Sequence, residues 1–137
     1  MLFRSRVNDI RQAYQDCMTE HCGIFRTQEI MEAGLVKLKE IQIQAECVKL
    51  DDRSRTWNSE LVEALELRSL MRVGEIILTS ALNRRESRGS HFREDCPDRD
   101  DAKFLQHTIA SYSSAAGVTI DYMPVVVNQF EPKERKY

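Results

Sequence analysis

Ionisable side chains are concentrated in one segment of the chain, residues 84–101. This segment contains five arginines and six carboxylates, so it is close to neutral and very dense in ion-pairing groups. Arginine presents a planar fork of donors that matches a carboxylate, which makes Arg88 and Arg93 candidates for binding a dicarboxylate. We favour the alternative that they pair with acidic residues of the same segment, namely Glu86, Asp95, Asp98 and Asp100.

His91 lies in the same segment and is one of three histidines in the chain. Neighbouring charges are expected to shift its pKa, and a histidine that titrates near neutral pH could transfer a proton. A histidine within a charged loop is more often packed or hydrogen-bonded, and we predict that structural role for His91. For the charged segment as a whole, the competing interpretation is a loop that stays in solvent.

Motifs that would build a catalytic, cofactor or metal site are missing from the sequence. The five glycines form no Gly-x-Gly-x-x-Gly fingerprint, no phosphate loop and no Gly-x-Ser-x-Gly elbow. The cysteines contain no Cys-x-x-Cys pair and are expected to be reduced thiols that bind no metal; they are Cys17, Cys22, Cys47 and Cys96. We therefore predict no catalytic, cofactor-binding or metal-binding residue in this chain.

Charge and hydropathy exclude two further classes of function. The net charge is −2 and neither half is strongly basic, so no electrostatic footprint for nucleic acid is present. No apolar run reaches the roughly 18 residues that a spanning helix needs, so we expect no direct insertion into a membrane. The N-terminus lacks the apolar region of a signal peptide.

Two segments with a helical apolar period precede the middle of the chain. The first is expected to end near Gly23 and places these residues on one face: Phe3, Val7, Ile10, Tyr14 and Cys17. The second begins at Thr27, a good N-cap residue. Its apolar face consists of Met31, Leu35, Leu38, Ile41, Ala45 and Val48.

A third helix is expected to begin at Asn58 or Ser59 and to lead into the charged segment. Its apolar residues cover much of the circumference, which predicts packing on several sides and a central position. They are Leu61, Val62, Leu65, Leu70, Met71, Val73, Ile76, Ile77, Leu78, Ala81 and Leu82. Leu70 and Ile77 are expected to be buried, so truncating either one should destabilise the fold strongly. Gly74 predicts a close helix crossing.

Beyond Asp101 the pattern changes to short runs of β-branched and aromatic residues. Residues 108–112 and 118–122 predict two strands, joined into a hairpin by a five-residue loop. Pro124 is expected to end the second strand, with brief further pairing possible at residues 125–127. An isolated hairpin is marginal in water, so this one is expected to pack on the helices or on a partner.

Together the elements predict a mainly α fold, an antiparallel three-helix bundle with a small C-terminal β-hairpin and an extended tail at residues 131–137. We expect residues 1–102 to form the bundle with its charged loop. Residues 103–137 are expected to form the hairpin and tail packed on the bundle, within a single domain overall.

Several stretches of the sequence, which together span most of the chain, resemble one known family. They read CGIFRT at 22–27, WNSEL at 57–61, RRESRGSHFRED at 84–95, PDRDD at 97–101, DDAKFLQHT at 100–108 and EPKERKY at 131–137. They resemble the C-terminal helical domain of the succinate dehydrogenase and fumarate reductase flavoprotein subunit. Two departures are Ser90, where that family usually has alanine, and the single Pro132, where it often has two prolines.

The resemblance implies a role inside a larger enzyme. In that family a hydride moves between the dicarboxylate and FAD, and electrons then pass to an iron–sulfur partner. The flavin loop, the flavin-attaching histidine and the dicarboxylate-binding residues of the family lie upstream and match no position here. The resemblance therefore implies that FAD belongs to the parent enzyme and that this chain holds no cofactor itself.

By the same resemblance, the chain buttresses the upstream FAD-binding and capping domains and contributes to the surface that meets the iron–sulfur subunit. The candidate contact residues are Glu86, Arg88, His91, Arg93, Arg99 and Asp100. The implied location is cytoplasmic, with the parent enzyme peripheral at the inner face of the cytoplasmic membrane. Two alternatives stay open: an independent helical protein-interaction module, and the same domain of a related flavoprotein such as L-aspartate oxidase.

Overall fold

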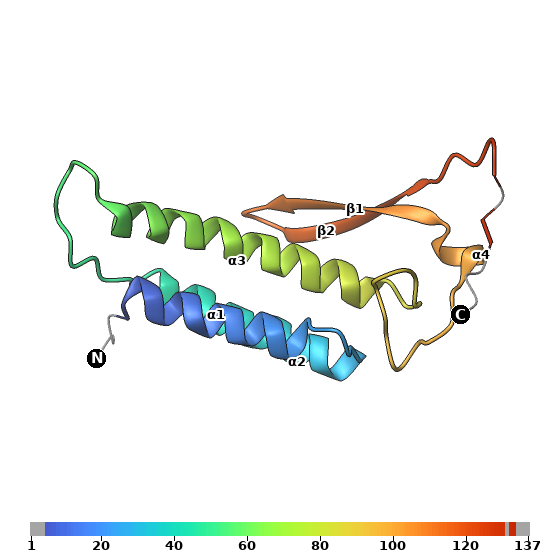
Figure 1. Ribbon diagram of the computed structural model, residues 1–137, viewed down its shortest axis with the longest axis horizontal. Coiled ribbons are helices and arrows are strands. Elements are labelled where there is room, and N and C mark those ends of the chain that lie inside the picture. The colour runs from blue at the N-terminus through green and yellow to red at the C-terminus, as the bar shows by residue number, and fades with distance from the viewer. Residues whose placement is uncertain (1–4, 131, 134–137) are drawn as a thin grey trace.

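The computed structural model describes residues 5–130, 132 and 133 of the 137-residue chain. Three long helices lie side by side, and a two-stranded hairpin runs along the third (Figure 1). The elements are α1 (Val7–His21), α2 (Gln28–Ala45), α3 (Ser59–Asn83), α4 (Asp101–Phe104), β1 (Gln106–Ser113) and β2 (Gly117–Pro124). The predicted mainly α fold with a small C-terminal hairpin is confirmed. The predicted tail falls mostly on residues outside the described part.

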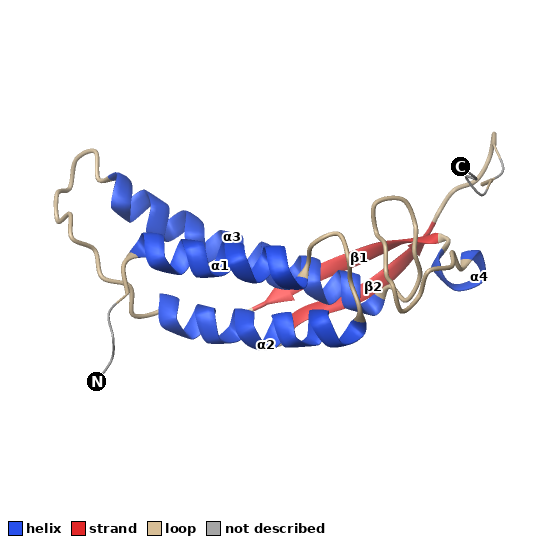
Figure 2. Cartoon of the chain, turned by 60° about the horizontal axis from the view of Figure 1, so that its bottom comes forward, coloured by secondary structure: helices blue, strands red, loops and turns tan. Residues whose placement is uncertain are grey.

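Local signals set the ends of the three long helices. The Thr27 side chain accepts a hydrogen bond from the backbone N–H of Ile30 at the start of α2, and the Asn58 side chain accepts one from Leu61 at the start of α3. Both caps satisfy a backbone donor that has no partner inside its helix. Helix α1 ends at His21, just before Gly23, as expected. Successive helices run in opposite directions, which forms the antiparallel bundle (Figures 1 and 2).

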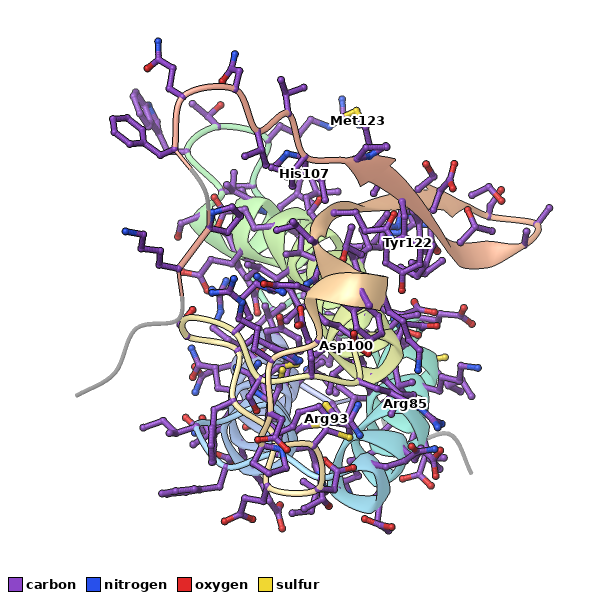
Figure 3. The ribbon with its side chains drawn as sticks, turned by 90° about the vertical axis from the view of Figure 1, so that its right-hand side faces the viewer. Arg85, Arg93, Asp100, His107, Tyr122 and Met123 are labelled. Atoms are coloured by element: carbon purple, nitrogen blue, oxygen red, sulfur yellow. The ribbon has the colours of Figure 1, made fainter. Side chains whose placement is uncertain are left out.

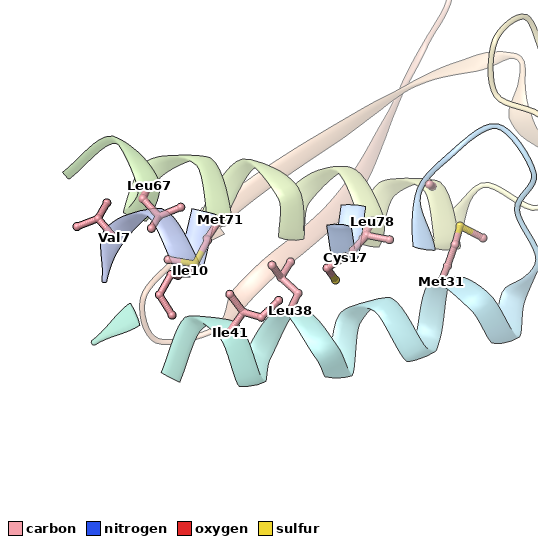
Figure 4. Packing of buried hydrophobic residues seen from close by; sticks show 10 residues of the cluster. Val7, Ile10, Cys17, Met31, Leu38, Ile41, Leu67, Met71 and Leu78 are labelled. Carbon is pink, nitrogen blue, oxygen red and sulfur yellow. The ribbon is translucent and has the colours of Figure 1, made fainter. Parts of the chain in front are cut away.

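The core lies between the three helices (Figure 4). Its fully buried apolar residues are Val7, Ile10, Cys17, Met31, Leu38, Ile41, Leu67, Met71, Leu78 and Ala81. The first two helices contribute the faces that the apolar spacing predicts, although Phe3 lies outside the described residues. Other predicted positions are partly buried against this core, namely Tyr14, Leu35, Ala45 and Val48.

Helix α3 differs from the prediction. Its buried side consists of Leu67, Met71, Gly74, Leu78 and Ala81, and Leu67 was missing from the predicted set. Leu70 and Ile77 were expected to be buried, but they are 39% and 45% exposed. The expectation was wrong because α1 and α2 cover only one side of α3 and the hairpin covers another. A third side of the helix, rich in apolar residues, faces outward in this chain.

Two glycines permit close contact between helices. A Cβ atom at Gly74 would lie 2.8 Å from Tyr14 Cε2, so the predicted helix crossing at Gly74 is confirmed. A Cβ atom at Gly34 would lie only 2.5 Å from the Cβ of His21. At both positions the absence of a side chain lets α1 pack directly against a neighbouring helix backbone.

The hairpin is longer than predicted. Strands β1 and β2 pair antiparallel over eight residues each, with Ala110 opposite Ile120, and Gly117 has the positive φ of 70° that opens β2. Pro124 is the last residue of β2, as expected, and no pairing is found at residues 125–127. The hairpin packs on α3, and the Arg72 guanidinium lies over the Tyr112 ring. This contact explains how two strands alone remain ordered.

Candidate functional site: a charged cluster at the end of helix α3

The charged segment folds back on the C-terminal end of α3 and forms a compact cluster beside the base of the hairpin (Figure 3). The loop contains a local bridge between Arg88 and His91, closed by two backbone hydrogen bonds of 2.8 and 3.0 Å, and Gly89 occupies the turn with φ 60°. Two charged side chains of the segment, Glu86 and Arg93, are 0% exposed. The interpretation of a simple solvated loop is therefore wrong.

Glu86 is the centre of the first half of the cluster. Its carboxylate accepts hydrogen bonds from Arg84, from Arg88 at 2.8 and 2.9 Å, and from the backbone N–H of Asp100 at 2.8 Å. Burial alone raises the pKa of Glu86, but the donors of Arg88, Asp100 and Arg84 together outweigh it and lower the pKa. The carboxylate is therefore ionised and fully paired, as a buried charge must be.

Arg88 joins the buried centre of the cluster to its surface. Besides its two-point contact with Glu86, it donates to Asp101 Oδ1 at 2.6 Å. Asp101 also accepts from Arg99, and hydrogen bonds from Arg99 and Arg88 hold the pKa of Asp101 well below its usual range. Pairing of Arg88 within the segment was expected, but its second partner is Asp101, which the sequence reasoning did not select.

Arg93 forms the second half of the cluster with Asp95. The Arg93 Nε and Nη2 atoms lie 2.9 and 2.5 Å from the two oxygens of Asp95, and Nη1 donates to the Leu82 carbonyl at 3.0 Å. Asp95 also accepts a hydrogen bond of 3.0 Å from the backbone N–H of Gln28, which is the first residue of α2. The pair therefore connects the end of α3 to the start of α2.

His91 is held between two elements. Its Nε2 lies 3.0 Å from the Arg84 carbonyl, and its Nδ1 lies 3.1 Å from Arg26 Nη1. Because a guanidinium can only donate, Nδ1 accepts and Nε2 carries the proton. Burial lowers the pKa of His91, and the charges of Arg26, Arg93 and Arg84 lower it further, against the hydrogen bond to the Arg84 carbonyl. Both ring nitrogens of His91 are hydrogen-bonded, which agrees with the predicted packed or hydrogen-bonded histidine.

Arg84 fastens the hairpin to the cluster and was not among the candidate residues. It donates to the Phe104 carbonyl at 3.0 Å and to the Gln106 carbonyl at 2.6 Å, and it also reaches the hydroxyl of Thr108. The remaining candidate, Asp100, caps α4 by accepting from the Lys103 N–H at 3.1 Å. A basic residue at the exact end of a helix was the one sequence signal that could have pointed to Arg84.

A solvent-open hollow of about 480 Å³ lies between the cluster and the hairpin base. Its lining residues are Arg84, Arg88, His91, Phe104, Leu105, Gln106, His107, Thr108 and Val125. The guanidinium groups that line it are already paired with carboxylates or carbonyls. Within the described residues we find no group of three or more metal-ligating side chains. The arrangement fastens α2, α3 and the hairpin together and presents no activated nucleophile.

The four cysteines are free thiols. Burial raises the pKa of the Cys17 and Cys22 thiols, which disfavours the reactive thiolate. None of the described helices combines the length and the hydropathy needed to cross a bilayer.

Comparison with known proteins places this architecture in a family. Residues 11–137 match the family described as "Fumarate reductase flavoprotein C-term". The chain is 43% identical over 121 residues to the succinate dehydrogenase flavoprotein subunit of Rickettsia bellii, covering 88% of this chain and 20% of the relative. It is 38% identical over 130 residues to the fumarate reductase flavoprotein subunit of a Serratia strain, covering 93% of this chain and 22% of the relative.

The fold is also that of a solved enzyme. FrdA of the Escherichia coli quinol fumarate reductase superposes with a TM-score of 0.90 at 35% identity, covering 95% of this chain and 23% of that chain. The protein belongs to the fumarate reductase flavoprotein C-terminal family, and the predicted resemblance is confirmed. The chain spans about a fifth of the length of the curated relatives that it matches.

The described residues lack the structural unit that usually holds a flavin dinucleotide. Such a cofactor is usually held by a strand–turn–helix unit of a parallel sheet, where glycines let the backbone approach the pyrophosphate. The only sheet in the described part is the antiparallel β1–β2 hairpin, and the two glycines with positive φ, Gly89 and Gly117, lie in a charged loop and a hairpin turn.

Proposed function

We propose that this chain is the C-terminal scaffold of a flavoprotein subunit that interconverts succinate and fumarate with FAD and passes electrons to an iron–sulfur partner. The observation that carries the proposal is the match over residues 11–137, together with the two relatives named for succinate dehydrogenase and fumarate reductase. In this proposal FAD and the reacting dicarboxylate are held by the rest of the subunit. The enzyme lies in the cytoplasm, peripheral at the inner face of the cytoplasmic membrane.

In this proposal the chain contributes structural support and takes no part in the chemical step. The two arginines considered for dicarboxylate binding, Arg88 and Arg93, each donate to carboxylates within the charged cluster, which supports a structural role for both. A rigid support of this kind holds the surfaces that position reacting groups, and positioning accounts for a large share of enzymatic rate enhancement. The upstream FAD-binding and capping domains and the iron–sulfur subunit are its proposed partners.

A chimera tests this function. The C-terminal fifth of the Rickettsia bellii subunit is replaced by this chain, and retained flavin and succinate-dependent reduction of a dye are measured. We expect flavin and activity in the chimera and neither in the isolated chain. A chimera that folds without flavin would favour an independent interaction module. Flavin bound by the isolated chain would contradict the scaffold role.

The outward side of the charged cluster is the proposed contact with the neighbouring domains. Two of the candidate residues keep part of their side chains at the surface there, with Arg88 at 26% and Arg99 at 23% exposure, whereas Glu86 and Arg93 are fully buried. We expect Arg88→Ala to damage flavin retention in the chimera more than it lowers the stability of the isolated chain, because an interface would desolvate the pair further. Arg55→Ala, in the loop before α3, is the control. If Arg88→Ala destabilised the isolated chain as much as it reduced flavin retention in the chimera, Arg88 would have only a structural role within this domain.

A further inference from the structure

Helix α3 has an apolar side that no part of the described chain covers. Five residues form this outer stripe: Val62, Leu65, Leu70, Val73 and Ile77. Their exposed fractions run from 39% to 61%. Their successive spacings of three, five, three and four residues place them on one broad side of the helix, distinct from the side that packs on α1 and α2. Only one charged residue, Glu66, falls on this side.

Single exposed apolar residues are ordinary on a protein surface, but a continuous stripe along a 25-residue helix is not. A helix that is apolar on more than one side is typically enclosed by further protein. The hairpin does not fill this position, because its contacts with α3 lie near Arg72 and Glu75, on a third side. The outer stripe therefore has the character of a surface that another protein segment covers.

The end of the bundle near Val62 carries a second exposed apolar group. Trp57, in the loop that leads into α3, is 97% exposed. It also adopts a φ of 57°, a conformation that a bulky residue rarely takes. Backbone strain of this kind is usually kept where it serves a function, and tryptophan is enriched among the residues that dominate interfaces.

The path of the chain indicates which partner reaches this surface. The segment before α1 is attached at the same end of the bundle, because Lys49 donates its backbone N–H to the Ser5 carbonyl at 3.1 Å. Arg11 on α1 lies against Glu63 on α3, with 3.4 Å between the guanidinium and the Glu63 carbonyl. The start of α1, the end of α2 and the loop that leads into α3 lie at one end of the bundle (Figure 1), so in a subunit as long as the relatives the preceding polypeptide joins this chain at that end.

We propose that the outer stripe of α3, with Trp57 at its end, is the docking surface for the preceding four-fifths of the flavoprotein subunit. This inference rests on the proposed function and adds to it an apolar surface separate from the charged cluster. The cluster is internally satisfied, whereas the stripe has apolar area that only another protein surface can remove from water. Burial of that area drives association, and charged groups at the rim set orientation.

The test compares two valine-to-aspartate substitutions. Val73→Asp places a charge in the outer stripe, and Val36→Asp places the same charge on α2, where Val36 is 63% exposed and outside the stripe. In the isolated chain, both variants should keep the urea midpoint near the wild-type value. In the chimera with the Rickettsia bellii subunit, we expect Val73→Asp to lower the yield of flavin-loaded, protease-resistant protein at least about ten-fold. Val36→Asp should leave that yield unchanged.

Val62→Asp, in the first half of α3, repeats the test if Val73→Asp unfolds the isolated chain. Stripe variants that match the wild-type yield in a flavin-loaded chimera would overturn the inference and leave the proposed function standing. A wild-type chimera without flavin would overturn both. An isolated chain that is dimeric in sedimentation, and becomes monomeric on Val73→Asp, would assign the stripe to a second copy instead and overturn the inference.

Discussion

Arg93 and Asp95 form a two-point ion pair in which the guanidinium is completely buried, with N–O distances of 2.9 and 2.5 Å. The two residues are near neighbours in sequence, so the loop supplies both partners. The pair also connects two helices. The Arg93 guanidinium donates to the Leu82 carbonyl near the end of α3, and the Asp95 carboxylate accepts from the Gln28 N–H at the start of α2. One ion pair therefore links the end of α3 to the start of α2.

Arg93→Lys should destabilise the isolated chain by about 1.5–3 kcal/mol, because lysine keeps the charge but loses the planar pair of donors. Urea unfolding followed by circular dichroism measures the change. Arg85→Lys is the matched control, since Arg85 is exposed in the same segment, and its midpoint should stay at the wild-type value. Equal midpoints for both variants would show that the two-point geometry is unimportant.

Leu78→Ala should cost roughly 2–5 kcal/mol, whereas Ile77→Ala on the same helix should cost well under half of that in the isolated chain. Leu78 is 0% exposed in the core and Ile77 is 45% exposed on the outer stripe. The free energies of unfolding of the two variants provide the comparison. If Ile77→Ala lowered the free energy of unfolding as much as Leu78→Ala, Ile77 would be buried, as the apolar pattern predicted.

Gly34→Ala should lower stability by about 1–3 kcal/mol, although alanine is the better helix former. The new methyl group would sit 2.5 Å from the His21 Cβ, which lies too close to its own backbone to move freely. The melting temperature reports the effect. Glu32→Ala, on the exposed side of the same helix, is the control and should change the melting temperature little.

Stability should fall on acidification through the titration of His91. Burial lowers the pKa of His91 below its usual 6.5 in the folded protein, so the unfolded chain binds more protons in the window below 6.5. The free energy of unfolding therefore decreases as the pH drops through that window. Unfolding measured at pH 7.5 and about pH 5.5 should show a smaller decrease for His91→Gln, which cannot titrate. The same decrease in both proteins would assign the effect to other groups.

The sequence by itself determined the three long helices and the existence of the hairpin, although the strands are longer than predicted and α4 was not predicted. Apolar spacing, the caps Thr27 and Asn58, and the turn before Gly117 are local signals, and each acts within a few residues of the structure that it specifies. The family was also readable from sequence, because the charged segment and the tail carry a specific order of residues. The pairing of the arginines inside the charged segment follows from composition, since so many opposite charges in one loop satisfy each other.

Only the tertiary structure decided which apolar side of α3 is inside and which carboxylate each arginine takes. Apolar residues cover much of the circumference of α3 in the sequence, but α1 and α2 pack on one side of the helix and the hairpin on another, which leaves Leu70 and Ile77 partly exposed. Arg88 meets Asp101 thirteen positions away because the loop folds back on itself. Contacts between distant residues depend on where whole elements dock, and local sequence carries no signal for that choice.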